Sequence, residues 1–235
     1  MQIVIVLFPR LTVLDAIGPY QTLDHLPGGE VLFVAEQAGP VRDETGQLAL
    51  VADAALADVP HPDVVLVPGG PGVDALIDQS AGGGPVADWL RAVDQTTTWT
   101  TSVCTGSLVL AAAGLLTGRR ATSHWLALEQ LARYGAVPVS QRVTFDEKYV
   151  TAAGVSAGID MGLTLAGRMA GDEVAQSIQL MLEYDPQPPY QAGSPERAPE
   201  IAARFRAGSR YPQPAGWPNN GVAGQGALSS IGAHG

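Results

Sequence analysis

The sequence predicts an α/β fold with a mostly parallel sheet between two layers of helices. Short, continuous apolar runs, which are typical of strands buried on both faces, alternate with helical segments along the chain. Glycine and proline separate the two kinds of segment. The 235 residues, 46% of them hydrophobic, are enough for one such domain with a large core, and a second domain is not required.

Buried strands are expected wherever a short apolar or β-branched run is bounded by turn residues. In chain order these runs are residues 3–8, 30–35, 63–67, 98–103, 137–139, 143–146 and 149–152. Two further runs, residues 41–43 and 48–51, flank Glu44-Thr45-Gly46 and predict a small hairpin outside the parallel sheet.

Helices are expected in the intervals between the strands. They are predicted at residues 85–94, from the cysteine to about 113, and at 125–131, 161–169, 172–182 and 199–206. In the segment 11–26, Gly18-Pro19 predicts an interrupted turn, with Pro19 opening a new helix at its first position. Asp172 is the expected N-cap of the helix that it begins.

The pattern changes after Asp185, where prolines interrupt the chain repeatedly. Beyond residue 206 the sequence consists mainly of Gly, Pro, Ala, Ser and Asn and has no useful periodicity. We therefore predict one α/β domain over residues 1–206, followed by a Gly/Pro-rich C-terminal tail over residues 207–235.

The composition excludes several classes of function. A net charge of −10 with only 13 Lys and Arg residues argues against a nucleic-acid partner. No segment approaches the roughly 18 apolar residues of a membrane span, and the N-terminus has no signal-peptide pattern. The single cysteine excludes an intramolecular disulfide and suits a reducing cytoplasm. Zinc-ligand spacing and nucleotide-binding glycine motifs are both absent from the sequence, so we expect no metal and no cofactor.

Residues 102–106 hold the strongest candidate for chemistry. Ser102-Val103-Cys104-Thr105-Gly106 is the thiol counterpart of a nucleophile elbow, a sharp strand-to-helix turn that exposes a nucleophile at the edge of the sheet. The helix N-terminus favours an anion, so the pKa of the Cys104 thiol is expected to fall. The alternative is a buried free cysteine that acts as a small hydrophobe. The spacing alone does not decide between the two.

Two other strand ends are expected beside Cys104, because the carboxyl ends of parallel strands lie at one edge of the sheet. Pro68-Gly69-Gly70-Pro71-Gly72 follows one strand, and the N–H groups of Gly70 and Thr105 could form an anion hole. The alternative for this loop is a plain turn.

Two titratable residues could assist the thiol. Asp15, near the end of the first strand, could transfer protons or could be an ordinary helix cap. His124, at the start of a helix, could pair with Cys104 or could satisfy local hydrogen bonds.

Three motifs resemble those of the ThiJ/PfpI superfamily, within a similarity that runs from about residue 2 to 182. They are residues 68–72 (PGGPG), 101–107 (TSVCTGS) and 122–125 (TSHW). Residues 14–19, 154–160 and 183–195 look like the isocyanide hydratase branch, and the last of these extends the resemblance beyond the shared core.

This resemblance implies a flavodoxin-like, class I glutamine amidotransferase-like three-layer sandwich that is usually a homodimer. It implies that Cys104 attacks the terminal carbon of an isocyanide and that Asp15, hydrogen-bonded to it, transfers protons. A thioimidate would then be hydrolysed to an N-substituted formamide. Gly69, Gly70 and Val155 would lie beside the substrate. Val155 stands where isoleucine is expected, a change that should affect packing but not the reaction class.

Thr105 and Asp15 separate branches of the superfamily. Peptidase-like relatives carry His where this chain has Thr105, and many relatives carry Glu where it has Asp15, so the resemblance favours a hydratase. Two alternatives remain. Similar elbows occur in sensor domains of AraC-type regulators, although the roughly fifty residues after Leu182 are Pro/Gly-rich rather than basic. A glyoxalase-like or redox-responsive protein would carry the same cysteine.

Overall fold

The computed structural model describes residues 1–81 and 84–208. The chain divides into two compact units, Met1–Tyr184 and Asp185–Gly235. The predicted tail falls almost entirely on residues 209–235, which lie outside the described residues, so the domain boundary at residue 206 stays a prediction. In the described part, no helix has the length and apolar character needed to cross a membrane.

A seven-stranded sheet forms the centre of the first unit, with the order β10-β11-β7-β6-β1-β2-β5. Neighbouring strands run parallel except for β10 and β11, which confirms the predicted, mostly parallel sheet. The strands are β1 (Gln2–Val6), β2 (Glu30–Ala35), β5 (Ala54–Ala55), β6 (Val64–Val67), β7 (Trp99–Val103), β10 (Val143–Asp146) and β11 (Tyr149–Ala152).

Two small sheets lie outside this central one. β3 (Gly39–Arg42) and β4 (Ala49–Ala52) pair antiparallel and form the predicted hairpin. The two-residue strands β8 (Arg120–Ala121) and β9 (Val137–Pro138) pair parallel to each other.

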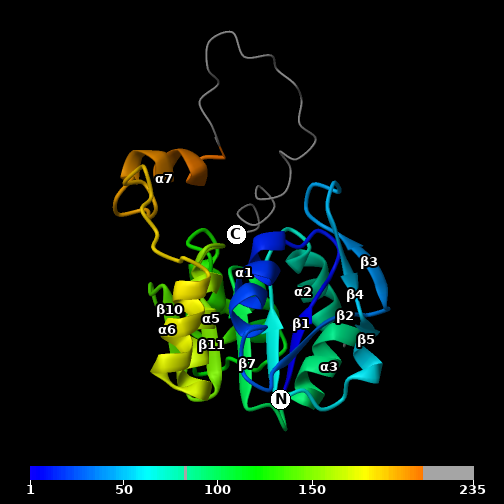
Figure 1. The fold of residues 1–235 in the computed structure, drawn as a ribbon. Coiled ribbons are helices and arrows are strands. Elements are labelled where there is room, and N and C mark those ends of the chain that lie inside the picture. Colours follow the sequence, from blue (N-terminus) through cyan, green and yellow to red (C-terminus); the bar gives the residue numbers. More distant parts are fainter. Residues whose placement is uncertain (82–83, 209–235) are drawn as a thin grey trace. The chain divides into compact units, whose positions relative to one another are not determined.

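Helices cover both faces of the central sheet (Figure 1). On one face, α1 (Val13–Leu23) packs against α5 (Ala157–Ala170), which packs against α6 (Asp172–Met181). On the other face lie α2 (Val73–Ala81), α3 (Pro85–Val93) and α4 (Gly106–Ala112), which contact one another. Two 3₁₀ helices, η1 (Leu56–Asp58) and η2 (Leu128–Tyr134), complete the first unit. The helix α7 (Pro199–Arg206) belongs to the second unit and has the predicted bounds.

The core lies around the two central strands, β1 and β6. Their side chains from Ile3 to Val6 and from Val64 to Val67 are fully inaccessible to solvent. Because helices cover both sides, each position along these strands must be apolar, which explains the continuous rather than alternating pattern.

The prediction of an interrupted helix at Gly18-Pro19 is wrong, because α1 runs through both residues. Proline removes one backbone hydrogen bond inside a helix. At Gly18 the helix packs closely on α5, where a Cβ would lie 3.2 Å from Ile159 Cγ1. This close packing keeps the segment helical despite the lost bond.

Other local predictions also need correction. Gly171, with a φ of 92°, is the N-cap of α6, and Asp172 is its first helical residue. Within the segment predicted as a helix over residues 125–131, residues 125–127 form a turn, and the 3₁₀ helix η2 begins at Leu128 and continues to Tyr134. Three elements were not predicted from the sequence: α2, which follows a loop of prolines and glycines, and the two-residue strands β5 and β8.

Candidate active site

Cys104 lies in the predicted strand-turn-helix elbow, between β7 and α4. Its φ is 58°, a conformation that strains a residue other than glycine, and its exposed fraction is 6%. Gly106 allows α4 to approach the end of β6, since a Cβ at this position would lie 2.1 Å from the carbonyl oxygen of Val67. The geometry of the elbow is therefore set by a strained nucleophile position and a glycine two residues later.

The structure brings Cys104 together with the other two predicted strand ends. The N–H of Gly69, after β6, donates to Asp15 Oδ2 of α1 at 2.9 Å, and the N–H of Gly70 donates to Thr105 Oγ1 at 3.0 Å. A side chain at Gly69 would not fit, because its Cβ would lie 2.6 Å from both the nitrogen and Oγ1 of Thr105. The glycine loop is thus more than a plain turn, because it joins Asp15 to the elbow.

The carboxyl group of Asp15 is fully buried beside the cysteine. Within the described part of the chain, its Oδ1 has no ordinary hydrogen-bond partner, and the carboxyl interacts with the Cys104 thiol. The alternative that Asp15 is a helix cap is wrong, because the N-cap of α1 is Thr12 and the Asp15 side chain bonds to Gly69 instead.

Burial controls the ionisation of this pair. It raises the pKa of Asp15 to about 7, against the opposing effects of the Gly69 N–H and the thiol. The negative charge of Glu44 raises the pKa of Asp15 further.

Burial also raises the pKa of the Cys104 thiol, and the Asp15 charge raises it further, while the N–H groups of Thr105 and Val155 lower it. The predicted fall of the thiol pKa is therefore wrong, because the short helix α4 does not offset burial and a neighbouring carboxylate. The resting site instead holds a neutral thiol beside a carboxyl group that exchanges its proton near neutral pH.

His124 lies against the loop before α5. A Cβ at Gly154 would lie 3.0 Å from His124 Cδ2. Nδ1 accepts a hydrogen bond from the Leu126 N–H at 3.3 Å, so Nε2 carries the proton of the neutral ring, and burial lowers the pKa of His124. The ring also packs beside Trp125, with the centroids 5.8 Å apart. These contacts are the local ones expected of a histidine at this position, and they do not include Cys104.

Sequence reasoning missed three residues around the site. The hydroxyl groups of Ser107 and Ser123 each donate to the backbone oxygen of Cys104 at 3.1 Å. Glu44 accepts a hydrogen bond from the Thr12 hydroxyl at 3.1 Å, close enough to act on Asp15. Ser123 lies within the TSHW motif, which was a usable signal. Glu44 lies at a hairpin tip, and nothing in the sequence relates it to Asp15.

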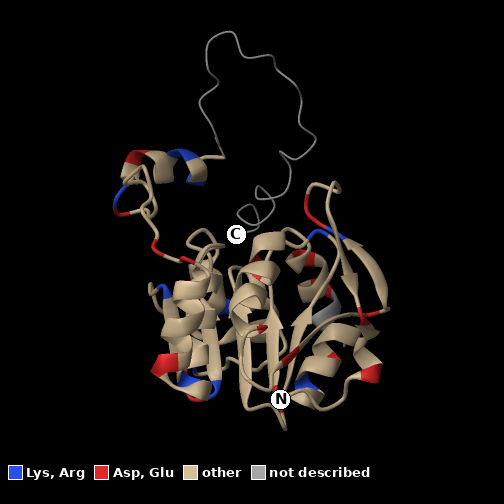
Figure 2. Ribbon diagram, viewed as in Figure 1, with Lys and Arg blue, Asp and Glu red and all other residues tan. Residues whose placement is uncertain are grey.

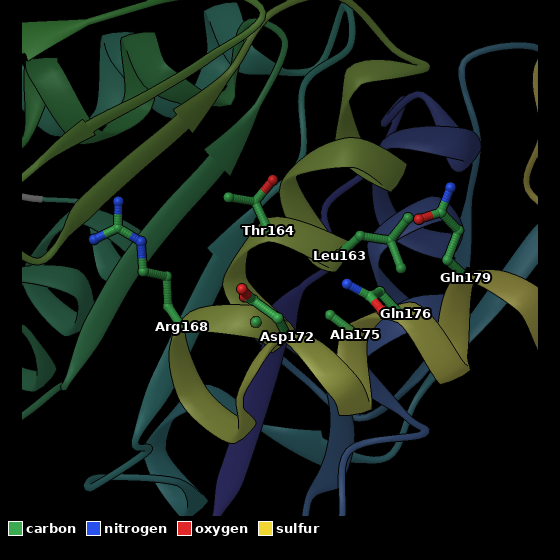
Figure 3. Close-up of a pocket in the computed structure, with 8 residues that line it drawn as sticks. Leu163, Thr164, Arg168, Asp172, Ala175, Gln176 and Gln179 are labelled. Carbon is green, nitrogen blue, oxygen red and sulfur yellow. The ribbon is translucent and has the colours of Figure 1, made fainter.

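A separate groove of about 300 Å³ lies between α5 and α6 (Figure 3). None of its lining residues is a candidate site residue: Leu163, Thr164, Gly167, Arg168, Asp172, Ala175, Gln176 and Gln179. The groove is therefore distinct from the cluster around Cys104.

The basic residues of the first unit are spread out. Figure 2 shows its described Lys and Arg residues dispersed over separate elements.

Within residues 1–81 and 84–208, no three His, Cys, Asp or Glu side chains are grouped so that they could hold a metal ion.

Comparison with known proteins places this site in a family. The model of the DJ-1/PfpI family matches residues 1–168. The chain is 45% identical over 210 residues to the isonitrile hydratase of Pseudomonas putida, a match that covers 88% of this chain and 90% of that enzyme. It is 32% identical over 147 residues to the HTH-type transcriptional regulator CdhR of Pseudomonas aeruginosa, covering 62% of this chain and 42% of the regulator.

A solved structure agrees with these matches. The crystal structure of a ThiJ/PfpI family protein from Pseudomonas syringae superposes with a TM-score of 0.79 at 36% identity, and covers 87% of this chain and 86% of that protein. Together with the elbow, the matched residues establish that the chain belongs to the DJ-1/PfpI family.

Proposed function

We propose that this protein is an isocyanide hydratase, a cysteine-dependent hydro-lyase that converts an isocyanide and water to an N-substituted formamide. The similarity to the Pseudomonas putida enzyme over nearly the whole of both chains supports this assignment. The match to the regulator CdhR covers less than half of that protein and does not favour a sensor. The observation that carries the proposal is the buried pair of Cys104 and Asp15, whose side chains interact with each other.

The first half of the reaction uses both members of the pair. The sulfur of Cys104 attacks the terminal carbon of the isocyanide, and the thiol proton passes to the carboxylate of Asp15. Asp15 then delivers that proton to the same carbon, which gives a thioimidate. A carboxyl group with a pKa of about 7 is suited to accepting and returning a proton near neutral pH.

The second half adds water. A water oxygen bonds to the thioimidate carbon, one water proton goes to the nitrogen, and the carbon–sulfur bond breaks. The other water proton returns to the Cys104–Asp15 pair. The products are the N-substituted formamide and the original enzyme, so the pair acts as a proton carrier and no oxidant or reductant is needed.

The hydrogen bonds of the glycine loop are more consistent with isocyanide hydration than with acyl transfer, a reaction that uses free N–H groups to stabilise an oxyanion. The Gly70 N–H is committed to the Thr105 hydroxyl and the Gly69 N–H to Asp15, so both support the side chains of the site. We therefore assign Gly69 and Gly70 to positioning, whereas the sequence suggested that the Gly70 N–H could form an anion hole with the Thr105 N–H and the resemblance implied that both glycines lie beside the substrate. An isocyanide carbon that receives a proton develops no oxyanion, so the reaction does not require such a hole.

The N–H of Val155 faces the thiol from the loop before α5. We assign Val155 to the wall of the substrate site and Thr105 to the support of the elbow. We further propose that the enzyme is cytoplasmic, since its single cysteine suits a reducing compartment. We also propose that it is a homodimer, on the family resemblance alone. A monomeric mass in solution would contradict the dimer alone.

The direct test is incubation of the purified protein with an aryl isocyanide while formamide production is followed. We expect turnover that is lost in Cys104→Ala. Formamide production no greater than in Cys104→Ala would overturn the proposal. Consumption of methylglyoxal in place of the isocyanide would favour the glyoxalase-like alternative.

A further inference from the structure

Two buried hydroxyl groups converge on the backbone oxygen of the nucleophile. Ser107 Oγ and Ser123 Oγ each lie 3.1 Å from the Cys104 oxygen and donate to it. Their exposed fractions are 0% and 2%. Ser107 belongs to the first turn of α4, whereas Ser123 follows β8, so the two donors reach one acceptor from different elements.

This acceptor is part of the peptide group that also contains the N–H of Thr105. That N–H faces the Cys104 sulfur and stabilises its charged form. Since a peptide group is planar, fixing its oxygen also fixes the direction of its N–H. Hydrogen bonds to the oxygen also polarise the group and make the N–H a stronger donor. The two hydroxyl groups can therefore act on the sulfur through a single peptide.

The same hydroxyl groups hold a strained backbone. Cys104 has a φ of 58°, and its own N–H donates to the oxygens of Ala152 and Ala153 at 3.0 and 2.8 Å. The N–H of Leu108 bonds to Thr105, one residue after Cys104. The Cys104 oxygen is thus held by side chains, and a positive φ persists only where the surroundings impose it.

Ser123 is itself fixed by its neighbours. The N–H of Thr122 donates to Thr151 Oγ1 of β11 at 2.8 Å, and the His124 oxygen accepts the N–H of Ala127 at 2.8 Å. The first bond ties Thr122 to the sheet and the second closes the turn after His124, so the TSHW motif has a structural role that does not require His124 to reach the thiol.

We propose that Ser123, together with Ser107, is a positioning residue for the nucleophile, which holds the Cys104–Thr105 peptide so that its N–H points at the sulfur. The expected kinetic effect rests on the proposed hydratase function. The effect on the thiolate does not, because it can be measured without substrate. Among the described residues, the charged side chain that acts on the sulfur is Asp15, and it is kept in every variant below.

The test compares Ser123→Ala and Ser107→Ala with Ser102→Ala. Ser102 is a matched control because its hydroxyl group is buried two residues before Cys104 but has no hydrogen-bond partner among the residues that the structure describes. The rate of Cys104 alkylation by iodoacetamide is measured against pH, and kcat and KM are measured with an aryl isocyanide. Circular dichroism and urea unfolding establish that each variant is folded.

We expect Ser123→Ala and Ser107→Ala each to shift the pH midpoint of Cys104 alkylation upward by about half a pH unit or more. We expect kcat to fall about tenfold with little change in KM. Ser107→Thr, which restores a hydroxyl group, should recover the wild-type profile, and Ser102→Ala should match the wild type.

Superimposable alkylation profiles for wild type, Ser123→Ala and Ser107→Ala would overturn the proposal, as would an equal shift in Ser102→Ala. If Ser123→Ala does not fold, Ser107→Ala and its threonine rescue decide the question. A shifted alkylation profile in an enzyme that does not hydrate isocyanides would contradict the proposed function and leave the positioning role intact.

Discussion

The backbone N–H of Gly70 donates a hydrogen bond to the side-chain oxygen of Thr105, with a nitrogen–oxygen distance of 3.0 Å. This bond joins the loop after β6 to the elbow after β7, and both residues are buried. Thr105 therefore contributes twice to the site: its N–H faces the Cys104 sulfur, and its hydroxyl oxygen fixes the glycine loop that carries Asp15's hydrogen-bond partner, Gly69.

Replacing Thr105 by valine keeps the shape of the side chain but removes the acceptor. The Gly70 N–H would then be buried without a partner, which destabilises a protein by about 1–3 kcal/mol. We expect Thr105→Val to lower the free energy of unfolding by that amount in urea denaturation. Thr105→Ser, which keeps the oxygen, is the control and should lose much less. Equal stability of the valine and serine variants would show that the bond does not support the loop.

Replacing Asp15 by asparagine should abolish most of the hydratase activity. The amide oxygen can still accept the Gly69 N–H, so the fold should be kept, but the amide cannot accept the thiol proton. We expect kcat to fall about 10²–10⁴-fold, the usual contribution of a general acid or base. The measurement is formamide production, with circular dichroism as the check on folding. A nearly normal rate would remove Asp15 from the reaction.

The same variant should change how stability depends on pH. The pKa of Asp15 rises from an ordinary 3.8 to about 7 in the folded protein, so the fold favours the protonated carboxyl. The contribution of Asp15 to the stability of the fold is therefore greatest below pH 3.8, where the carboxyl is protonated in both the folded and the unfolded chain. Between pH 3.8 and about 7 the unfolded chain has released the Asp15 proton while the folded protein still holds it, so this contribution falls as the pH rises and is lost above pH 7. An asparagine amide cannot ionise, so Asp15→Asn should be the more stable protein at pH 8, by at most about 4 kcal/mol.

Urea denaturation of wild type and Asp15→Asn at several pH values between 5 and 8 checks this expectation. The stability difference should grow with pH over that interval. Asp15→Ala is the contrasting variant: it also removes the charge but leaves the Gly69 N–H without an acceptor, so part of the gain should be lost. A difference that stays constant with pH would mean that Asp15 is not protonated preferentially in the fold.

The fold and the position of the elbow could be predicted because both depend on local patterns. The apolar strand before Cys104 and the small residues after it are visible in the sequence, as are the other buried strands and Pro199 at the start of α7. The interrupted helix at Pro19 was wrong because close packing of Gly18 on α5 is a tertiary contact.

The ionisation of the site could not be predicted, for the same reason. Helix position alone suggested that the thiol pKa would fall, but the outcome depends on how deeply Cys104 is buried and on the carboxylate beside it. The hydrogen bonds from Ser107 and Ser123 to the Cys104 oxygen could not be predicted either, because no sequence pattern shows that hydroxyl groups from two separate elements share one acceptor.

The reactivity of Cys104 toward iodoacetamide tests the electrostatics of the pair without substrate. Because burial and the Asp15 charge both raise the thiol pKa, the wild-type protein should be alkylated more slowly at pH 7 than the same cysteine in urea-unfolded chain, with a rate that increases with pH. In Asp15→Asn the negative charge is gone, so the thiolate is less disfavoured and the alkylation profile should move to lower pH.

The midpoint and the plateau rate at high pH together separate an electrostatic effect from simple exposure of the sulfur. Loosening of the site would raise the plateau rate as well as lower the midpoint, because burial raises the thiol pKa, whereas removal of the neighbouring charge lowers the midpoint and leaves the plateau rate near the wild-type value. Because the Asp15 and Cys104 side chains interact, the pH profile of alkylation in the wild type reports the titration of both groups together. In Asp15→Asn it reports the titration of Cys104 alone. An unchanged midpoint in Asp15→Asn would mean that the carboxylate does not act on the thiol, and the proton carrier proposed for the hydration reaction would then lack one of its two members.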